Sequence, residues 1–473
     1  VLVDVPVGEV VRPHDDLGGA RVQVRDDADL PPGEVDQVPG LTRSAGPPGP
    51  DTDLLTPISE GGPMASTLPA DDVTRILLDL FSPANRADPY PLFAQLREGG
   101  PVHETPLGIR LVTRHAECTA VLQNPSWGHN QGPDGAFRGG DSFLFMNPPQ
   151  HTRLRGMVSR TFTPRMISGL APRIERLVDQ LLDAMVEAGE TDLIAALAYP
   201  LPMTIVCELL GIPVSDYPVF HEWSIAIARG LDPEILLSPE EKTRRDESTA
   251  AFYDYFRELA LSRRDQPAGD LISALAAVDE NGDGLSDTEL LGTGNLLLNA
   301  GHETSVNLIG NGLLALLRHP EQFAALRADP QLVPSAVQEL LRFDAPIQLI
   351  PRDALTELEL AGETLPPGSG VAVLLAAANR DPAAYPDPDR LDVTRFHGRQ
   401  AAPPRHLAFS LGVHFCLGAG LALLEMETLL RRLIERGITI DPLTDEPAFK
   451  PNVILRGPER LPVSVHEPAP RRA

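Results

Sequence analysis

Residues Phe409-Ser410-Leu411-Gly412-Val413-His414-Phe415-Cys416-Leu417-Gly418 place one cysteine in a glycine-containing loop. An Ala/Leu-rich segment, residues 419–424, follows directly and is typical of a helix. A thiolate at a helix N-terminus is favoured by the macrodipole and by free backbone N–H groups, so this position predicts a lowered pKa for the Cys416 thiol. Glycines here let the backbone pass close to a flat, bulky ligand. A lone cysteine is more often a small buried apolar residue, so the surrounding motifs must decide.

Three further motifs precede the cysteine loop. Ala300-Gly301-His302-Glu303-Thr304 lies inside a long apolar helical pattern over residues 287–317. Glu339-Leu340-Leu341-Arg342 puts an acid and a base at i and i+3, and Val393-Thr394-Arg395-Phe396 follows. Each motif alone is weak, since such a Glu–Arg pair usually lies on a solvated surface. Together and in this order, the four motifs resemble the cytochrome P450 superfamily, in particular its soluble three-component bacterial branch. The resemblance covers about residues 71–466.

The resemblance implies a mainly α fold with minor β sheets in a single large domain. It also implies haem b (iron protoporphyrin IX) as cofactor, with the Cys416 thiolate as axial ligand to the haem iron. The other expected haem contacts are taken from the family's motifs and are His151, Arg155, Arg352, His414, Ala300, Phe409 and Gly418. Among these, His151, Arg155, Arg352 and His414 are expected to bind the propionates, and arginine suits this role because its fork can hold a carboxylate bidentately.

Glu303 and Thr304 are expected to be the catalytic pair. A threonine hydroxyl beside the haem can hydrogen-bond the oxygen substrate, and a preceding acid can feed protons through ordered water. The alternative is that Thr304 bonds back to a carbonyl of its own helix. Glu339, Arg342 and Arg395 match a buried cluster whose role is structural, because it ties their helix to the segment before the cysteine loop.

The family's activity is that of a haem-thiolate monooxygenase, which inserts one oxygen atom from O2 into a small organic substrate, here expected to belong to bacterial secondary metabolism. The sequence holds no flavin or iron–sulfur segment, so we expect electrons from a separate ferredoxin and its reductase. Two alternatives stay open: a haem-binding protein without turnover, which the intact Glu303-Thr304 pair disfavours, and a family member that catalyses oxidative coupling. Substrate contacts are expected from residues 126–141, 219–232, 296–300, 347–350 and 453–454.

This sequence departs from the family's pattern in places. Ser410 stands where the family usually has glycine, and Leu423 stands where an arginine is common and where an electron donor docks. Helices are also predicted, from apolar periodicity, over 90–97, 170–188, 193–210, 219–228, 239–264 and 417–436. Strands are predicted near 102–113, 358–365 and 371–375.

Composition limits the partners and the compartment. The formal net charge is −26, which argues against nucleic acid, since a nucleic-acid binder needs a basic surface. Three cysteines make no disulfide framework, and no apolar run reaches 18 residues, so a cytoplasmic protein without a membrane partner is expected. Residues 1–63 hold nine Gly, ten Pro, no aromatic residue and 12 acids against four bases. They are expected to be a disordered extension, or Met64 the true start, with residues 64–473 as the haem-thiolate domain.

Overall fold

The computed structural model describes residues 68–130, 142–276, 285–398 and 403–468. The chain divides into two units, Val1–Glu60 and Gly61–Ala473, and the first lies wholly outside the described residues. The expectation of a disordered extension over residues 1–63 therefore also lies outside the described residues. The account below concerns the second unit alone.

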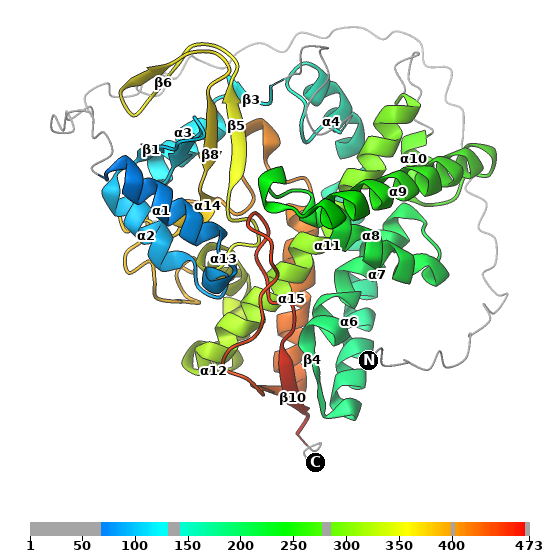
Figure 1. Ribbon diagram of the computed structural model, residues 1–473. Coiled ribbons are helices and arrows are strands. Elements are labelled where there is room, and N and C mark those ends of the chain that lie inside the picture. Colours follow the sequence, from blue (N-terminus) through cyan, green and yellow to red (C-terminus); the bar gives the residue numbers. More distant parts are fainter. Residues whose placement is uncertain (1–67, 131–141, 277–284, 399–402, 469–473) are drawn as a thin grey trace, which may run out of the picture. The chain divides into compact units, whose positions relative to one another are not determined.

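Helix α11, Asp287–Arg318, runs through the middle of this unit (Figure 1). A capping box starts it: the Ser286 hydroxyl accepts a hydrogen bond from the Glu289 N–H (3.2 Å), and the Glu289 carboxylate accepts one from the Ser286 N–H (2.9 Å). Pro320, which cannot continue a helix, follows its end. Most of its side chains are buried, because other helices pack along nearly its whole length.

The remaining α-helices are, in chain order, α1 (Ala70–Phe81), α2 (Tyr90–Gly99), α3 (His115–Gln123), α4 (Gln150–Thr161), α5 (Pro164–Gly169), α6 (Ala171–Ala188), α7 (Pro200–Leu210), α8 (Tyr217–Arg229), α9 (Pro239–Asp265), α10 (Leu271–Ala276), α12 (Pro320–Ala328), α13 (Val333–Phe343), α14 (Leu375–Asn379) and α15 (Ala419–Arg436). Helices α7, α8 and α9 pack on one side of α11, whereas α13 and α15 pack on another. Leu313, Leu340 and Leu430 belong to the apolar core that α11, α13 and α15 share with α6.

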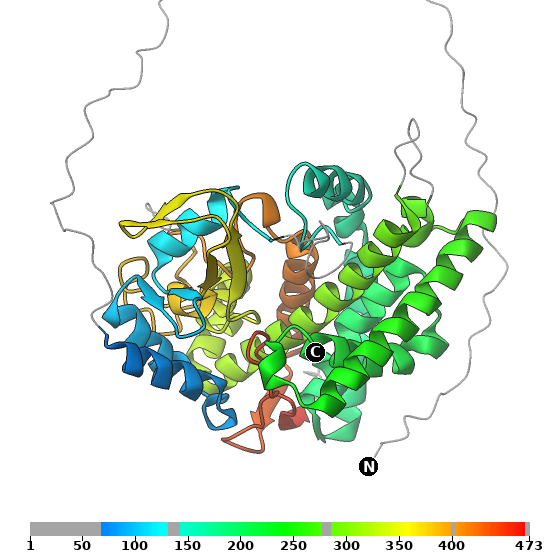
Figure 2. The same ribbon diagram turned by 45° about the horizontal axis from the view of Figure 1, so that its top comes forward.

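In the described residues, ten short strands form three sheets. The largest has the order β1 (Val102–Glu104), β2 (Arg110–Val112), β8 (Gly370–Val373), β5 (Ile350–Ala354) and β3 (Trp127–Gly128); β2 and β8 are parallel and the other pairs antiparallel. Strands β4 (Glu190–Asp192), β10 (Pro462–His466) and β9 (Thr439–Pro442) form a second sheet, and β6 (Leu358–Leu360) pairs with β7 (Glu363–Leu365). Figure 2 shows the large sheet with α1 and α2 on one side of α11 and α15, and α6 to α10 on the other.

The predicted helices and strands are present, with two differences. The helix predicted over 193–210 is a π-helical turn, Ile194–Ala198, followed by α7, with the Tyr199 N–H donating to the Ile194 carbonyl at 2.8 Å. Pro200 lacks an N–H and cannot continue the i→i−4 ladder, so the register changes there. The strand predicted over 358–365 is a hairpin, because Ala361 (φ +52°) and Gly362 (φ +84°) turn the chain.

Within the described part of the chain, none of the helices combines the length and the apolar character that a membrane span needs.

Candidate functional site

The cysteine loop contains a 3-10 turn, Gly412–His414, and leads directly into α15. The Cys416 N–H donates to the Phe409 carbonyl at 2.9 Å, which closes the loop. Gly412 has φ +65°, and a Cβ there would lie 2.4 Å from the Leu122 carbonyl oxygen, so no larger residue fits. Ser410 has φ +57°, the left-handed region that costs a non-glycine residue about 1–2 kcal/mol. The serine that departs from the family's glycine therefore strains this loop.

The Cys416 sulfur receives hydrogen bonds from the backbone N–H groups of Gly418 and Ala419, as expected at the start of a helix. Its pKa is nevertheless raised, because burial of the sulfur outweighs these donors and the nearby Arg155 guanidinium. The prediction of a lowered pKa is therefore wrong for the polypeptide alone, since the sequence does not show how deeply the sulfur is buried. A metal cation bound to the sulfur would supply the missing counter-charge and remove the thiol proton.

Five cationic or imidazole side chains gather beside this loop. His151 and Arg155 come from one face of α4, Arg352 from β5, and His414 from the 3-10 turn of the loop. The ring centroids of His151 and His414 are 4.5 Å apart, and His129, directly after β3, lies 5.3 Å from His414. Arg155 donates to the Phe415 carbonyl, next to Cys416. The structure thus brings together the four predicted propionate contacts and adds His129.

These side chains lack an anionic partner. Within the described residues, no carboxylate forms an ion pair with any of the five, and both ring nitrogens of His151 and Nε2 of His129 have no hydrogen-bond partner. Burial lowers the pKa of His151 to about 4, of His129 to about 3 and of Arg352 to about 10; for His414, burial and then the Arg352 charge lower the pKa to about 2. The three imidazoles are therefore neutral near pH 7, and the positive charge of this group, called here the positive cluster, comes from Arg155 and Arg352. Buried guanidiniums beside imidazole N–H groups fit a ligand with carboxylates. The residues present therefore fit haem, whose two propionates are such groups.

On α11, Ala300, Gly301 and Thr304 lie along a less buried part of the helix, whereas Glu303 is buried. The Thr304 hydroxyl donates to the Ala300 carbonyl at 2.6 Å, the back-bonded arrangement considered from the sequence. The Glu303 carboxylate accepts a hydrogen bond from Lys450, which also donates to Asn307 Oδ1 at 2.9 Å. The structure therefore places Glu303 and Thr304 together on α11 but pairs the acid with a lysine.

Glu339, Arg342 and Arg395 form the buried network expected from the sequence. Arg342 donates from Nε and Nη2 to the two Glu339 oxygens at 2.7 and 2.9 Å, and Arg395 Nε lies 3.1 Å from both. The Asp392 N–H donates to Glu339 at 2.9 Å, and Arg342 also donates to the Asn379 and Pro388 carbonyls. The network thus joins α13 to the chain that leads to the cysteine loop.

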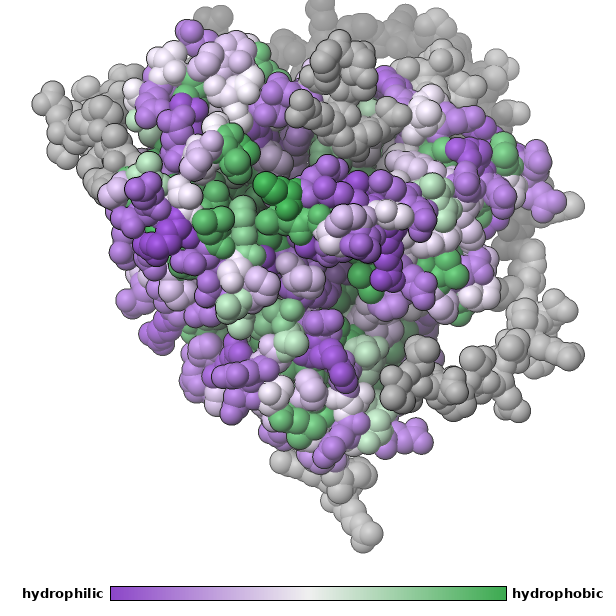
Figure 3. Space-filling view, in the orientation of Figure 1, coloured by the Kyte–Doolittle hydropathy of each residue, from purple (hydrophilic) through white to green (hydrophobic). Residues whose placement is uncertain are grey.

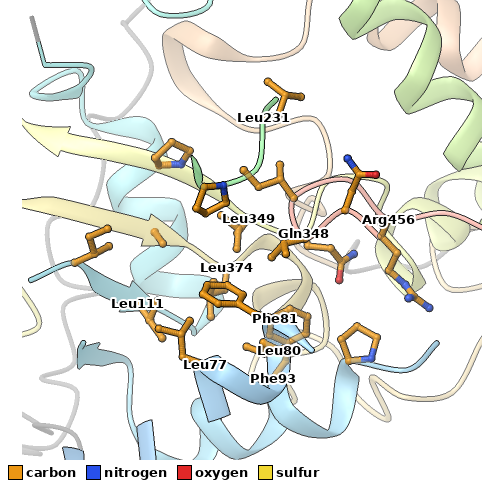
Figure 4. A pocket seen from close by; sticks show the side chains of 18 of the residues that line it. Leu77, Leu80, Phe81, Phe93, Leu111, Leu231, Gln348, Leu349, Leu374 and Arg456 are labelled. Atoms are coloured by element: carbon orange, nitrogen blue, oxygen red, sulfur yellow. The ribbon is translucent and has the colours of Figure 1, made fainter. Parts of the chain in front are cut away.

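Two cavities adjoin these groups. The first, called here the apolar cleft, has a volume of about 400 Å³ (Figure 4). Its wall is mainly apolar and includes Leu77, Leu80, Phe81, Phe93, Leu111, Leu349 and Leu374. Arg352 lies in the same wall, so the cleft reaches the positive cluster. Apolar side chains also gather on the face shown in Figure 3, over the region between α1 and residues 449–457.

Several substrate contacts predicted from the sequence line the apolar cleft, namely Leu231, Gln348, Leu349, Val453 and Ile454. Residues 131–141 of the predicted loop lie outside the described residues. The second cavity, called here the polar cavity, has a volume of about 430 Å³ and includes Tyr199, His221, Glu303 and Lys450 in its wall. Sequence reasoning missed His129 and Lys450. Only the scarcity of lysine, two in the chain, could have marked Lys450.

Known proteins match this sequence and this fold. A family model described as Cytochrome P450 matches residues 241–464. The monooxygenase PikC of Streptomyces venezuelae is 40% identical, over 80% of this chain and 91% of its own length. The 6-deoxyerythronolide B hydroxylase of Saccharopolyspora erythraea is 36% identical, over 81% and 98%. The crystal structure of ligand-free CYP164A2 from Mycobacterium smegmatis is 42% identical, with a TM-score of 0.75 over 82% of this chain and 99% of that one.

The chain therefore belongs to the cytochrome P450 family, the haem-thiolate monooxygenases. It has that family's fold, mainly α with small sheets, as predicted. It is an oxidoreductase that uses haem iron, redox partners and O2 to insert one oxygen atom into an organic substrate.

Proposed function

We propose that Cys416 is the axial ligand of haem b in a domain that spans residues 64–473. His151, Arg155, Arg352 and His414 would bind the two propionates, with His129 beside them. The observation that carries this proposal is the buried positive cluster next to the cysteine loop, which has no carboxylate partner among the described residues. Ala300, Phe409 and Gly418 would border the haem, since they lie on α11 and at the two ends of that loop.

When bound, the haem supplies O2 activation and oxygen transfer. The chain's own residues then orient the substrate, exclude water and move protons. Thr304 Oγ1 has one hydrogen, committed to the Ala300 carbonyl, and two lone pairs that can accept. In this arrangement the hydroxyl accepts a hydrogen bond until it rotates away from the carbonyl. Glu303 would bring protons to this part of α11, and Glu339, Arg342 and Arg395 would hold the loop in place.

The substrate is proposed to be a small lipophilic molecule of bacterial secondary metabolism that enters through the apolar cleft. Apart from Arg352, which is proposed to bind a propionate, the charged side chains in the cleft wall already have protein partners: for example, Arg456 pairs with Asp344 at 2.7 Å and Lys450 with Glu303. An uncharged body therefore suits the cleft better than a charged one. Relatives named for their reactions include a vitamin D(3) 25-hydroxylase and the 6-deoxyerythronolide B hydroxylase, which supports this class.

Electrons are proposed to come from a ferredoxin and its reductase. The surface beside the cysteine loop exposes Val413 and Arg405, and the Arg405 guanidinium lies 4.8 Å from the Phe415 ring centroid. A cation next to the metal ligand suits an acidic electron donor in a chain that is otherwise strongly acidic. Leu423 stands where the family often has an arginine, so Arg405 is proposed to contribute more to binding the electron donor.

The test is the absorption of reduced protein with carbon monoxide. A thiolate-ligated haem gives the strongly red-shifted Soret band, which Cys416→Ser should lose. Cys118→Ser and Cys207→Ser are matched controls, because both sulfurs are buried, and both variants should keep the band. Retention of the band in Cys416→Ser would overturn the proposal. A screen of neutral and charged lipophilic compounds by haem spin-state shift tests the substrate class.

A further inference from the structure

Lys450 is held between two parts of the molecule that are remote in sequence. It lies on a hairpin-like segment, residues 449–457, where the Lys450 N–H donates to the Gly457 carbonyl at 3.1 Å. Its ammonium reaches α11, where it pairs with Glu303 and donates to Asn307 Oδ1 at 2.9 Å. The side chains are 16% (Lys450) and 5% (Glu303) exposed. At this depth an ion pair persists only if its geometry and partners are good.

The polar cavity gives this ion pair a route to water. Glu303 and Lys450 both lie in its wall, next to His221 and Tyr199. Within the described residues, Glu303 Oε2 and His221 Nδ1 have no hydrogen-bond partner. Buried polar atoms of this kind are normally satisfied by ordered water, for which the cavity has room. The charged groups elsewhere in the wall are Asp192, Arg229, Glu241, Arg244 and Glu459.

A second buried glutamate shows what the lysine does. Among the described residues, Glu425 on α15 has the Ser305 hydroxyl as its one hydrogen-bond partner, and burial raises its pKa to about 8. Burial also acts to raise the pKa of Glu303, but the Lys450 ammonium, with smaller contributions from His302 and His221, outweighs it and leaves the pKa below its ordinary value. Both carboxyl groups are buried, and their pKa values shift in opposite directions mainly because Glu303 has a lysine beside it.

We infer that Lys450 is a positioning residue for proton supply: it holds the Glu303 carboxylate ionised and against the polar cavity, so that protons enter from water there and pass through Glu303 to the Thr304 part of α11. The inference rests on the proposed function, because it gives Glu303 its role in turnover. The same segment carries Val453 and Ile454 in the wall of the apolar cleft, so substrate and proton supply share one piece of chain.

The first test compares Lys450→Met with Lys450→Arg and with Lys242→Met, which removes the chain's other lysine, on α9. Without the ammonium, burial outweighs the smaller effects of His302 and His221, and the pKa of Glu303 should rise. The buried carboxyl is then protonated over more of the neutral range and is ionised only at higher pH. Because the inference needs the ionised carboxylate, we expect product formed per NADPH in Lys450→Met to be at least about fivefold lower at pH 6.5 than at pH 9. Wild type, Lys242→Met and Lys450→Arg should lack this titration. A Lys450→Met profile parallel to wild type would overturn the inference.

The second test needs no turnover. Protein labelled with ¹³C at lysine Cε gives two lysine signals, which Lys242→Arg assigns. In the reduced, carbon monoxide-bound protein, Glu303→Gln should move the Lys450 signal and leave that of Lys242 in place. An unmoved Lys450 signal would overturn the ion pair itself. Because the carbon monoxide band is recorded on the same samples, failure of the haem assignment is distinguished from failure of the Lys450 role.

Discussion

Glu339→Ala should destabilise the fold more than any ordinary loss of a helix Glu–Arg pair. Glu339 and Arg342 are 0% exposed and Arg395 is 3% exposed. Removing the carboxylate strands two buried guanidiniums and the Asp392 N–H, and breaking a buried ion pair typically costs about 3–5 kcal/mol. The loss should not double for the second arginine, because both guanidiniums keep backbone carbonyl partners, including Pro388 and Pro386.

This free energy translates into a measurable temperature shift. Unfolding entropy is about 2.1 cal/mol/K per residue, so the unit Gly61–Ala473 has about 0.9 kcal/mol/K. A loss of about 3–5 kcal/mol therefore lowers Tm by about 3–6 °C. The assay is thermal unfolding followed by far-UV circular dichroism, with haem absorbance recorded in parallel.

The control is Glu427→Ala, which breaks a Glu–Arg pair of the same chemistry on α15. Glu427 lies 3.3 Å from Arg431, but the two side chains are 27% and 42% exposed. Such exposed pairs contribute about 0.3–0.5 kcal/mol, so Tm should change by less than about 1 °C. If Glu339→Ala and Glu427→Ala have the same Tm, the Glu339 network does not stabilise the fold and the reasoning fails.

Three other outcomes are expected. The double variant Arg155→Ala/Arg352→Ala should fold but release haem faster to apomyoglobin, since each lost charge-assisted contact is worth about 1.5–3 kcal/mol; release at the wild-type rate would count against propionate binding. Thr304→Ala should keep the substrate-induced spin shift, while product per NADPH falls by up to about 10²–10⁴-fold, the contribution of one positioned proton donor, and peroxide rises. Unchanged coupling would show that the hydroxyl only bonds the Ala300 carbonyl and has no part in proton delivery. In haem-free protein, the pKa of His129 is near 3 against about 6.5 when unfolded, so the unfolded form binds more protons and stability falls as pH drops below 6.5. At pH 5 this imidazole should cost up to about 2 kcal/mol, a loss that His129→Gln removes in urea unfolding; an equal loss in that variant would refute it.

Local patterns in the sequence predict α11 and the cysteine loop well, because their signals lie within a few turns of chain. The Ser286 cap lies where α11 begins, the apolar periodicity extends along the helix, and Pro320 follows its end. The Glu339–Arg342 pair is likewise local, and its burial follows once α13 packs on α11 and α15. Where a single proline changes the register, as at Pro200, periodicity alone is misleading.

The features that could not be predicted depend on how distant segments pack. Lys450 and Glu303 are 147 positions apart, and His129 meets His414 across the fold, so no spacing rule links them. The raised pKa of Cys416 has the same origin: the helix donors are local and predictable, but the burial that outweighs them is set by the whole surrounding structure. Charge balance at the site is therefore a tertiary property.

The shared position of the 449–457 segment has a consequence for changing this enzyme by directed evolution. Val453 and Ile454 face the apolar cleft, and their backbone N–H groups bond the Asp232 carboxylate at 2.8–3.0 Å, while Lys450 three residues earlier holds Glu303. A substitution selected there for a new substrate strains the same backbone that aims the ammonium. Substitutions in this segment therefore change substrate selectivity and the efficiency of NADPH use together. Leu77 and Leu111 lie across the cleft and can be varied without contacting the lysine.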